Sequence, residues 1–160
     1  MPAPESLVKW YGDKFKAIMK NKLATALEHI GILCEGRIVR SISGGSPSKP
    51  GSPPGRVTGA YSALMAHEVD IALLICRVGS FSEIAPYLEL GTGSRCERGG
   101  SPYMIVPTRK KVLHWRSEAG KDVFAQWVMH PGIHPRPHIR PGVFGARMEI
   151  MAILQRTAQI

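Results

Sequence analysis

The sequence has no long apolar run, no paired-cysteine pattern and no recognisable pattern of a secretory signal in its first residues. Its longest aliphatic cluster, residues 71–76, is far shorter than the roughly 18 residues that a transmembrane helix needs. Residues 1–5 lack the basic and then apolar pattern of a secretory signal. The three cysteines (Cys34, Cys76 and Cys96) include no Cys-x-x-Cys, so a disulfide framework is not expected. We therefore expect synthesis and folding in the cytosol, and no membrane partner.

Motifs for catalysis and cofactor binding are also missing. There is no Gly-x-x-x-x-Gly-Lys-Ser/Thr loop to hold a phosphate. The carboxylates Glu83, Glu89 and Glu97 are scattered, and no local signature marks a Ser-His-Asp or Cys-His arrangement. We therefore expect a protein that is not an enzyme and that needs no cofactor.

Three histidines recur every four residues, at His130, His134 and His138. On a helix this spacing would align three imidazoles for a metal ion. The prolines interleaved with them exclude a helix, so the spacing loses its geometric meaning. We favour a rigid extended segment without a metal, and keep a small hydrolase with a histidine site as a third hypothesis.

The chain carries a clear excess of positive charge. It has 21 Lys and Arg against 12 Asp and Glu, a formal charge of +9. Such an excess favours polyanions or acidic partner surfaces, although it also serves solubility alone. With 160 residues, of which 44% are hydrophobic, the chain is long and apolar enough for one domain with a real core.

The order of periodic segments predicts an α+β fold. Apolar residues recur at helical spacing over residues 12–42. Residues 43–59 hold four prolines and five glycines, which predicts a flexible arm. We expect a small, mostly antiparallel sheet packed by a long N-terminal, a short middle and a C-terminal helix. The strand candidates are residues 64–69, 71–78, 103–106, 111–115 and 123–129, the later helices are residues 82–90 and 143–159, and the Pro-rich residues 130–141 are expected to be irregular.

A basic cluster offers an alternative function. Its members are Arg109, Lys110, Lys111 and Arg116, with His114 and Trp115 between them. Basic side chains interleaved with an aromatic ring suit phosphate contact and base stacking. The simpler interpretation, which we favour, is a basic hairpin edge that discourages edge-to-edge aggregation. A cytosolic nucleic-acid-binding protein using residues 109–115 remains the second hypothesis.

Four motifs follow one another along the chain. A Pro/Gly-rich stretch, residues 47–55, precedes Val-Thr-Gly, and residues 85–92 read Ala-Pro-Tyr-Leu-Glu-Leu-Gly-Thr. Residues 105–113 read Ile-Val-Pro-Thr-Arg-Lys-Lys-Val-Leu, and residues 130–141 run from His-Pro-Gly to Arg-Pro. In this order they resemble the head–tail joining or tail-completion (neck) proteins of long-tailed phages, the gene-product-ten-like group of HK-type lambdoid phages.

The chain departs from the pattern of that family at two places. The family commonly has Arg or Leu shortly after Thr-Gly, where this chain has Ala60 and Tyr61. It also often has Phe at the position of His138.

The resemblance implies a structural protein of the virion. It implies one neck domain over residues 1–160, whose copies, assembled in the host cytoplasm, form a homo-oligomeric ring, expected to be a hexamer, at the head–tail junction. The ring would contact head-closure or connector proteins and the tail tube or tail terminator protein, and DNA would pass through its lumen. Which ring of the neck it forms stays open.

The resemblance also selects candidate residues. The motif or interface residues are Glu89, Gly91, Thr92, His130, Pro131, Gly132, Pro137, Arg140 and Pro141. The residues expected to face DNA or an acidic partner are Arg109, Lys110, Lys111 and Arg116. From its place near a helix end, Glu89 is expected to accept hydrogen bonds from nearby backbone N–H groups or to pair with an Arg of a neighbouring subunit.

Overall fold

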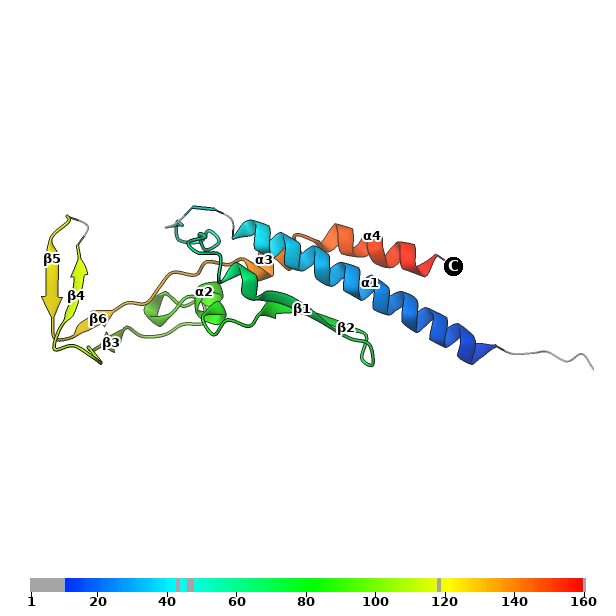
Figure 1. Ribbon diagram of the computed structural model, residues 1–160, viewed down its shortest axis with the longest axis horizontal. Coiled ribbons are helices and arrows are strands. Elements are labelled where there is room, and N and C mark those ends of the chain that lie inside the picture. The colour runs from blue at the N-terminus through cyan, green and yellow to red at the C-terminus, as the bar shows by residue number, and fades with distance from the viewer. Residues whose placement is uncertain (1–10, 43, 46–47, 118, 160) are drawn as a thin grey trace, which may run out of the picture.

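The computed structural model describes residues 11–42, 44–45, 48–117 and 119–159, and Figure 1 shows them as an elongated molecule. The long helix α1 (Gly12–Ser41) begins at one end. With 30 residues, it is about 45 Å long. The hairpin of β4 (Leu113–Arg116) and β5 (Asp122–Ala125) lies at the other end (Figure 1). The predicted N-terminal helix is confirmed.

The α+β class is also confirmed. The other elements are η1 (Ser62–Leu64), β1 (Met65–Asp70), β2 (Ile75–Ser80), α2 (Ala85–Leu90), η2 (Gly93–Arg95), β3 (Tyr103–Ile105), β6 (Val128–His130), α3 (Ile139–Phe144) and α4 (Arg147–Ala158). The strands form three separate antiparallel pairs, β1–β2, β3–β6 and β4–β5, instead of one small sheet. They remain separate because β1–β2 packs along α1 while the other two pairs extend away from it (Figure 1).

The core lies where α1 meets β1, β2, α3 and α4. One cluster of buried side chains consists of Ile30, Cys34 and Ala146, and a second consists of Ile38, Ile42 and Met65. Helix α4 lies antiparallel to α1 (Figure 1). Gly142 permits close approach of α3 to α1, since an added Cβ there would lie 2.5 Å from Cγ1 of Ile38. No helix of the described residues is long and apolar enough to cross a membrane.

Several predicted boundaries were wrong. The helix predicted over residues 143–159 is divided, because residues 143 and 144 belong to α3 and α4 begins only at Arg147. Residues 71–74 form the turn between β1 and β2 instead of the start of a strand, because the register pairs Met65 with Ser80 and Asp70 with Ile75. The strand predicted over residues 123–129 is two strands, β5 and β6, which pair with different partners. The Pro-rich segment is not wholly irregular, since Pro141 occupies the first turn of α3, where its missing N–H costs no hydrogen bond.

Candidate functional site

The structure joins two motifs that are separate in the sequence, residues 85–93 and 130–141. The N–H of Thr92 donates to the carbonyl of Ile133 at 3.0 Å, and the N–H of Ile133 donates to Oγ1 of Thr92 at 3.0 Å. The N–H of Arg136 donates to the carbonyl of Leu88 at 2.7 Å. We call this contact the α2–turn junction. It unites most of the motif residues that the sequence selected.

Glycines allow the two backbones to touch in this junction. Gly132 has a φ of 97°, and an added Cβ would lie 1.8 Å from the carbonyl oxygen of Thr92. Gly91 has a φ of 77°, and an added Cβ would lie 2.7 Å from the carbonyl oxygen of Ile133. Both positions therefore require glycine for conformation and for space.

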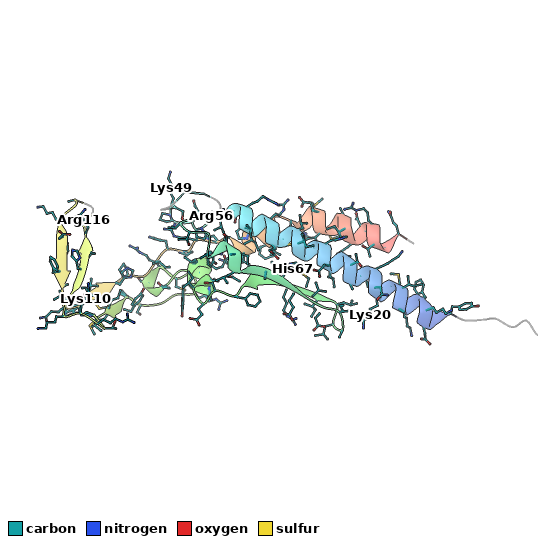
Figure 2. The ribbon with its side chains drawn as sticks, viewed as in Figure 1. Lys20, Lys49, Arg56, His67, Lys110 and Arg116 are labelled. Carbon is teal, nitrogen blue, oxygen red and sulfur yellow. The ribbon has the colours of Figure 1, made fainter. Side chains whose placement is uncertain are left out.

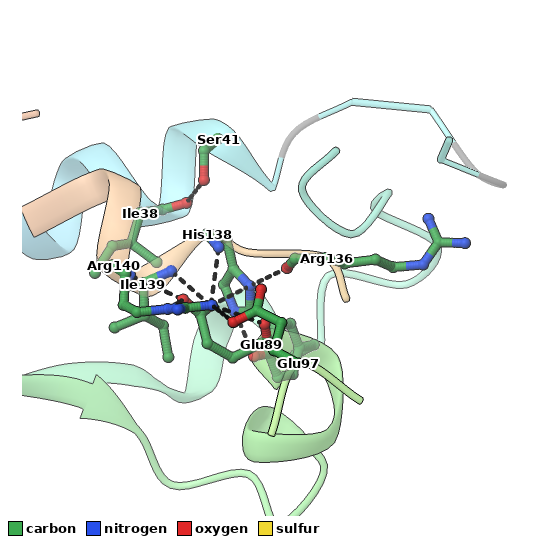
Figure 3. A network of polar contacts seen from close by, with 9 residues as sticks. Ile38, Ser41, Glu89, Glu97, Arg136, His138, Ile139 and Arg140 are labelled. Atoms are coloured by element: carbon green, nitrogen blue, oxygen red, sulfur yellow. Dashed lines mark hydrogen bonds and ion pairs between the residues drawn. The ribbon is translucent and has the colours of Figure 1, made fainter. Parts of the chain in front are cut away.

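The carboxylate of Glu89 is the centre of the junction (Figure 3). Its Oε2 accepts hydrogen bonds from the N–H groups of His138, at 2.9 Å, and Ile139, at 3.0 Å. Its Oε1 accepts from the N–H and from Nε of Arg140, both at 3.0 Å. The N–H donors lie at the start of α3, and the Arg is in the same chain. Glu89 thus bonds to a distant segment of its own chain and not to the N–H groups beside Gly91. Pairing of Glu89 with an Arg of a neighbouring subunit stays a prediction.

Glu89 stays charged although its side chain is buried. Burial by itself raises the pKa of this carboxyl. The hydrogen bonds from the backbone of His138, Ile139 and Arg140, together with the Arg140 guanidinium, outweigh burial and lower the pKa below its ordinary value. Arg140 is held in place from the other side by Glu97, whose Oε2 lies 2.8 Å from Nη2. The arrangement is a satisfied ion pair with a fixed geometry.

His138 is fully buried beside Glu89 and has partners for both ring nitrogens. Its Nδ1 lies 2.8 Å from the carbonyl oxygen of Arg136 and 3.1 Å from Oε2 of Glu89, so this nitrogen carries the proton. Its Nε2 then accepts from the hydroxyl of Tyr61 at 2.6 Å. Burial, followed by the charge of Glu89, raises the pKa of Tyr61 to about 12, although a hydrogen bond with Ser80 lowers it. The phenol therefore remains a donor.

The three histidines of the Pro-rich segment do not converge. His138 is enclosed as described, Nδ1 of His130 accepts from the N–H of Gly132 at 3.0 Å, and His134 is exposed. Within the described part of the chain, no three His, Cys, Asp or Glu side chains are placed to hold a metal ion.

The Pro/Gly-rich arm lies against the same turn. The guanidinium of Arg136 donates to both the carbonyl and the hydroxyl of Ser48. The N–H of Gly51 donates to the carbonyl of Pro135 at 3.0 Å. The sequence analysis did not identify Arg136 as a site residue. The only signal in the sequence that could have indicated its role is its place between Pro135 and Pro137. The flexibility of the arm stays a prediction, and residues 43, 46 and 47 lie outside the described residues.

The basic cluster lies far from this junction, near the β4–β5 end of the molecule. Arg109, Lys110 and Lys111 are exposed in the segment that leads into β4, and Arg116 is exposed on β4 itself. Figure 2 shows Lys110 near the base of the hairpin and Arg116 toward its tip. Trp115 is exposed between them. The structure therefore brings the four basic residues to one end, apart from Glu89.

Large apolar side chains are exposed on many elements. Those more than 70% exposed are Val57, Phe81, Phe144 and Met148. An apolar groove with a volume of about 620 Å³ also opens beside the α2–turn junction. It is lined by Ile84, Tyr87, Leu88, Thr92, Gly93, Tyr103 and Ile133. The sequence did not predict this groove.

Comparisons of the chain with protein-family models, with curated proteins and with solved structures found no match.

Proposed function

We propose that this protein is a structural, non-enzymatic subunit of a tailed-phage particle. Copies form a ring, expected to be a hexamer, at the head–tail junction, where the ring joins or completes the tail and lets DNA pass through its lumen. The ring contacts head-closure or connector proteins on one side and tail proteins on the other.

The observation that carries the proposal is the large accessible surface of a single copy. The chain exposes 12025 Å². A compact monomer of 17.5 kDa would expose about 7,900 Å². An allowance of about 2,400 Å² for the residues outside the described part still leaves an excess of roughly 1,700 Å². A standard protein–protein interface buries about 1,600 Å² in total, or about 800 Å² on each partner. A subunit of a ring makes two such contacts, so the excess matches what one copy needs to cover.

The α2–turn junction supports the same function. Glu89, His138 and Arg140 fix the start of α3 relative to α2, and Arg136 fixes the arm on the same turn. A ring subunit must present its interfaces in one geometry, because small angular errors accumulate around a closed ring. The buried carboxylate of Glu89, which bonds to the backbone at the start of α3 and to Arg140, supplies that geometry.

Immunogold electron microscopy tests this function directly. An antibody against the protein is applied to purified virions of the phage that encodes it, and an antibody against the tail tube protein serves as the control. We expect gold at the head–tail junction for the first antibody and along the tail for the second. Gold from the first antibody at any other place, or none on the particle, would contradict the proposal.

One observation favours a second candidate, binding of nucleic acid by the basic cluster. Arg109, Lys110 and Lys111 are all exposed, with the indole of Trp115 nearby. Fluorescence anisotropy with labelled DNA tests it over a range of salt concentrations. Binding that weakens steeply with salt and is lost in the Arg109→Ala/Lys110→Ala/Lys111→Ala variant supports this candidate. If that variant assembles normal particles but binds no DNA, the DNA function is separate from the ring.

A further inference from the structure

The tip of the β1–β2 hairpin is an apolar turn exposed to solvent. Ile71, Leu73, Leu74 and Ile75 are between 40% and 63% exposed. Exposed turns ordinarily consist of Gly, Pro, Asn, Asp and Ser, which satisfy or bend the backbone. Four large aliphatic side chains at this position cost free energy in water. They indicate a surface that a partner covers.

The shape of this tip is fixed before any partner binds. Oδ1 of Asp70 accepts hydrogen bonds from the N–H groups of Ala72 and Leu73, both at 3.0 Å. Leu74 adopts a φ of 53°, a left-handed conformation that a residue with a branched side chain rarely takes. A preformed convex tip loses little conformational entropy on docking.

The groove beside the α2–turn junction is the concave counterpart of this tip. Its lining side chains Ile84 and Tyr87 are more than half exposed, so the described residues of the chain leave them uncovered too. The hairpin points along α1 toward the start of that helix, away from α2 (Figure 1). The tip and α2, which lines the groove, therefore lie apart along the molecule (Figure 1), and a second copy is needed to bring a tip to a groove.

We infer that the tip of the β1–β2 hairpin of one copy docks into the apolar groove of the next copy. Tip and groove are different surfaces, so the contact is head-to-tail and repeats around a ring. The exposed charges behind the tip, Glu68 and Arg77, lie opposite each other across the hairpin, so the tip meets the groove as an apolar surface. The excess surface of roughly 1,700 Å² on one copy is what two such contacts, one through its tip and one through its groove, would cover at about 800 Å² each. Because the proposed function requires copies of this chain to join, the docking rests on it and specifies its contact.

Complementary variants test the docking by sedimentation velocity of the full-length protein. Leu73→Asp disables the tip, and Ile84→Asp disables the groove at the residue that caps α2, where Asp is favourable. We expect wild-type chains to associate and each variant to raise the dissociation constant at least about tenfold. Phe81→Asp, at the most exposed large apolar side chain, is the matched control and is expected to leave association unchanged. Circular dichroism verifies that all variants are folded.

Mixing the two variants distinguishes this contact from others. A mixture still contains one intact groove, on the Leu73→Asp chain, and one intact tip, on the Ile84→Asp chain. We expect it to form dimers and nothing larger. Association of either variant as tight as wild type, a mixture without dimers, or a wild-type chain that stays monomeric would overturn the docking. Loss of association in Phe81→Asp alone would assign the interface to another surface. Gold labelling of virions at the head–tail junction does not depend on these outcomes, so the ring function and the docking can fail separately.

Discussion

The hydroxyl of Tyr61 lies 2.6 Å from Nε2 of His138, and this hydrogen bond connects residues 77 positions apart. The imidazole of His138 is fully buried, so its Nε2 needs a polar partner within the protein. The phenol of Tyr61 supplies that partner. We therefore expect the effects of replacing these two residues on stability to be coupled.

A double-mutant cycle measures this coupling. Tyr61→Phe leaves the buried Nε2 of His138 without a donor and is expected to cost about 1–2 kcal/mol of unfolding free energy. In a protein that already carries His138→Phe, the change Tyr61→Phe should cost less stability than it does in the wild type, because no buried imidazole nitrogen remains to lose its donor. Urea denaturation supplies all four free energies. Tyr87→Phe, which removes the hydroxyl of a tyrosine that is 56% exposed, is the control and should change stability by less than about 0.5 kcal/mol. Strictly additive effects would contradict the coupling.

Replacing the buried carboxylate should be far more harmful than replacing its exposed neighbour. Glu89→Gln turns one acceptor oxygen into a donor that faces N–H groups, with an expected cost of about 2–4 kcal/mol. Glu97→Gln removes only the outer partner of Arg140, with an expected cost below about 1 kcal/mol. Urea denaturation of both variants at neutral pH makes the comparison. Equal costs would mean that Glu89 does not organise the junction.

Acid should weaken the junction through the same carboxylate. The pKa of Glu89 is lower in the folded protein than its ordinary value of 4.5. Its contribution to stability is therefore complete above that value and is lost as the pH falls through the folded pKa. We expect the unfolding free energy of the wild type to fall more steeply below about pH 4.5 than that of Glu89→Gln. If the unfolding free energies of the two proteins fell in parallel as the pH is lowered, Glu89 would not be the source of the acid dependence.

The attachment of the β1–β2 hairpin to α1 should depend on pH in the opposite direction, and its stabilisation should be lost as the pH rises. Nδ1 of His67 lies 2.6 Å from Oε2 of Glu35, and Nε2 lies 3.1 Å from Oε1 of Glu28. The bond with Glu35 raises the pKa of His67 above its ordinary value of 6.5, burial lowers it in part, and Glu28 raises it further. The stabilisation is complete below 6.5 and is lost as the pH rises through the folded pKa.

Unfolding of the wild type and of His67→Gln at about pH 6 and about pH 8 tests this dependence. We expect the wild type to lose more stability between the two values than His67→Gln does. His134→Gln, at an exposed histidine, should behave like the wild type. If His67→Gln lost as much stability between the two pH values as the wild type does, a group other than His67 would be responsible for the dependence.

Two glycines that both have a positive φ should differ sharply in their tolerance of alanine. Gly132 has a φ of 97°, and its added Cβ would collide with the carbonyl of Thr92 at 1.8 Å. Gly99 has a φ of 80°, but an added Cβ would meet nothing within 4 Å. Thermal unfolding should show a cost above about 3 kcal/mol for Gly132→Ala and about 1–2 kcal/mol for Gly99→Ala. A tolerated Gly132→Ala would mean that the two backbones do not touch there.

The features that the sequence predicted well are local ones. Apolar spacing predicted α1, and the Gly-Thr-Gly step predicted the end of α2, because each signal acts within a few residues of the backbone that it shapes. The aliphatic run over residues 71–78 was misassigned in its first half. An apolar run favours burial wherever it is found, and it does not distinguish a buried strand from a turn that protrudes toward a partner.

Contacts between distant segments were decided by the tertiary structure alone. Glu89 bonds to the backbone of His138, 49 residues away, and Tyr103 of β3 pairs with His130 of β6. No local pattern encodes these pairings, because their free energy depends on which segments the whole fold brings together. The sequence by itself determined where the chain can be helical and where it must turn. Only the tertiary structure made one buried junction of two motifs and left an apolar tip and an apolar groove uncovered, since burial and exposure are properties of the assembled chain.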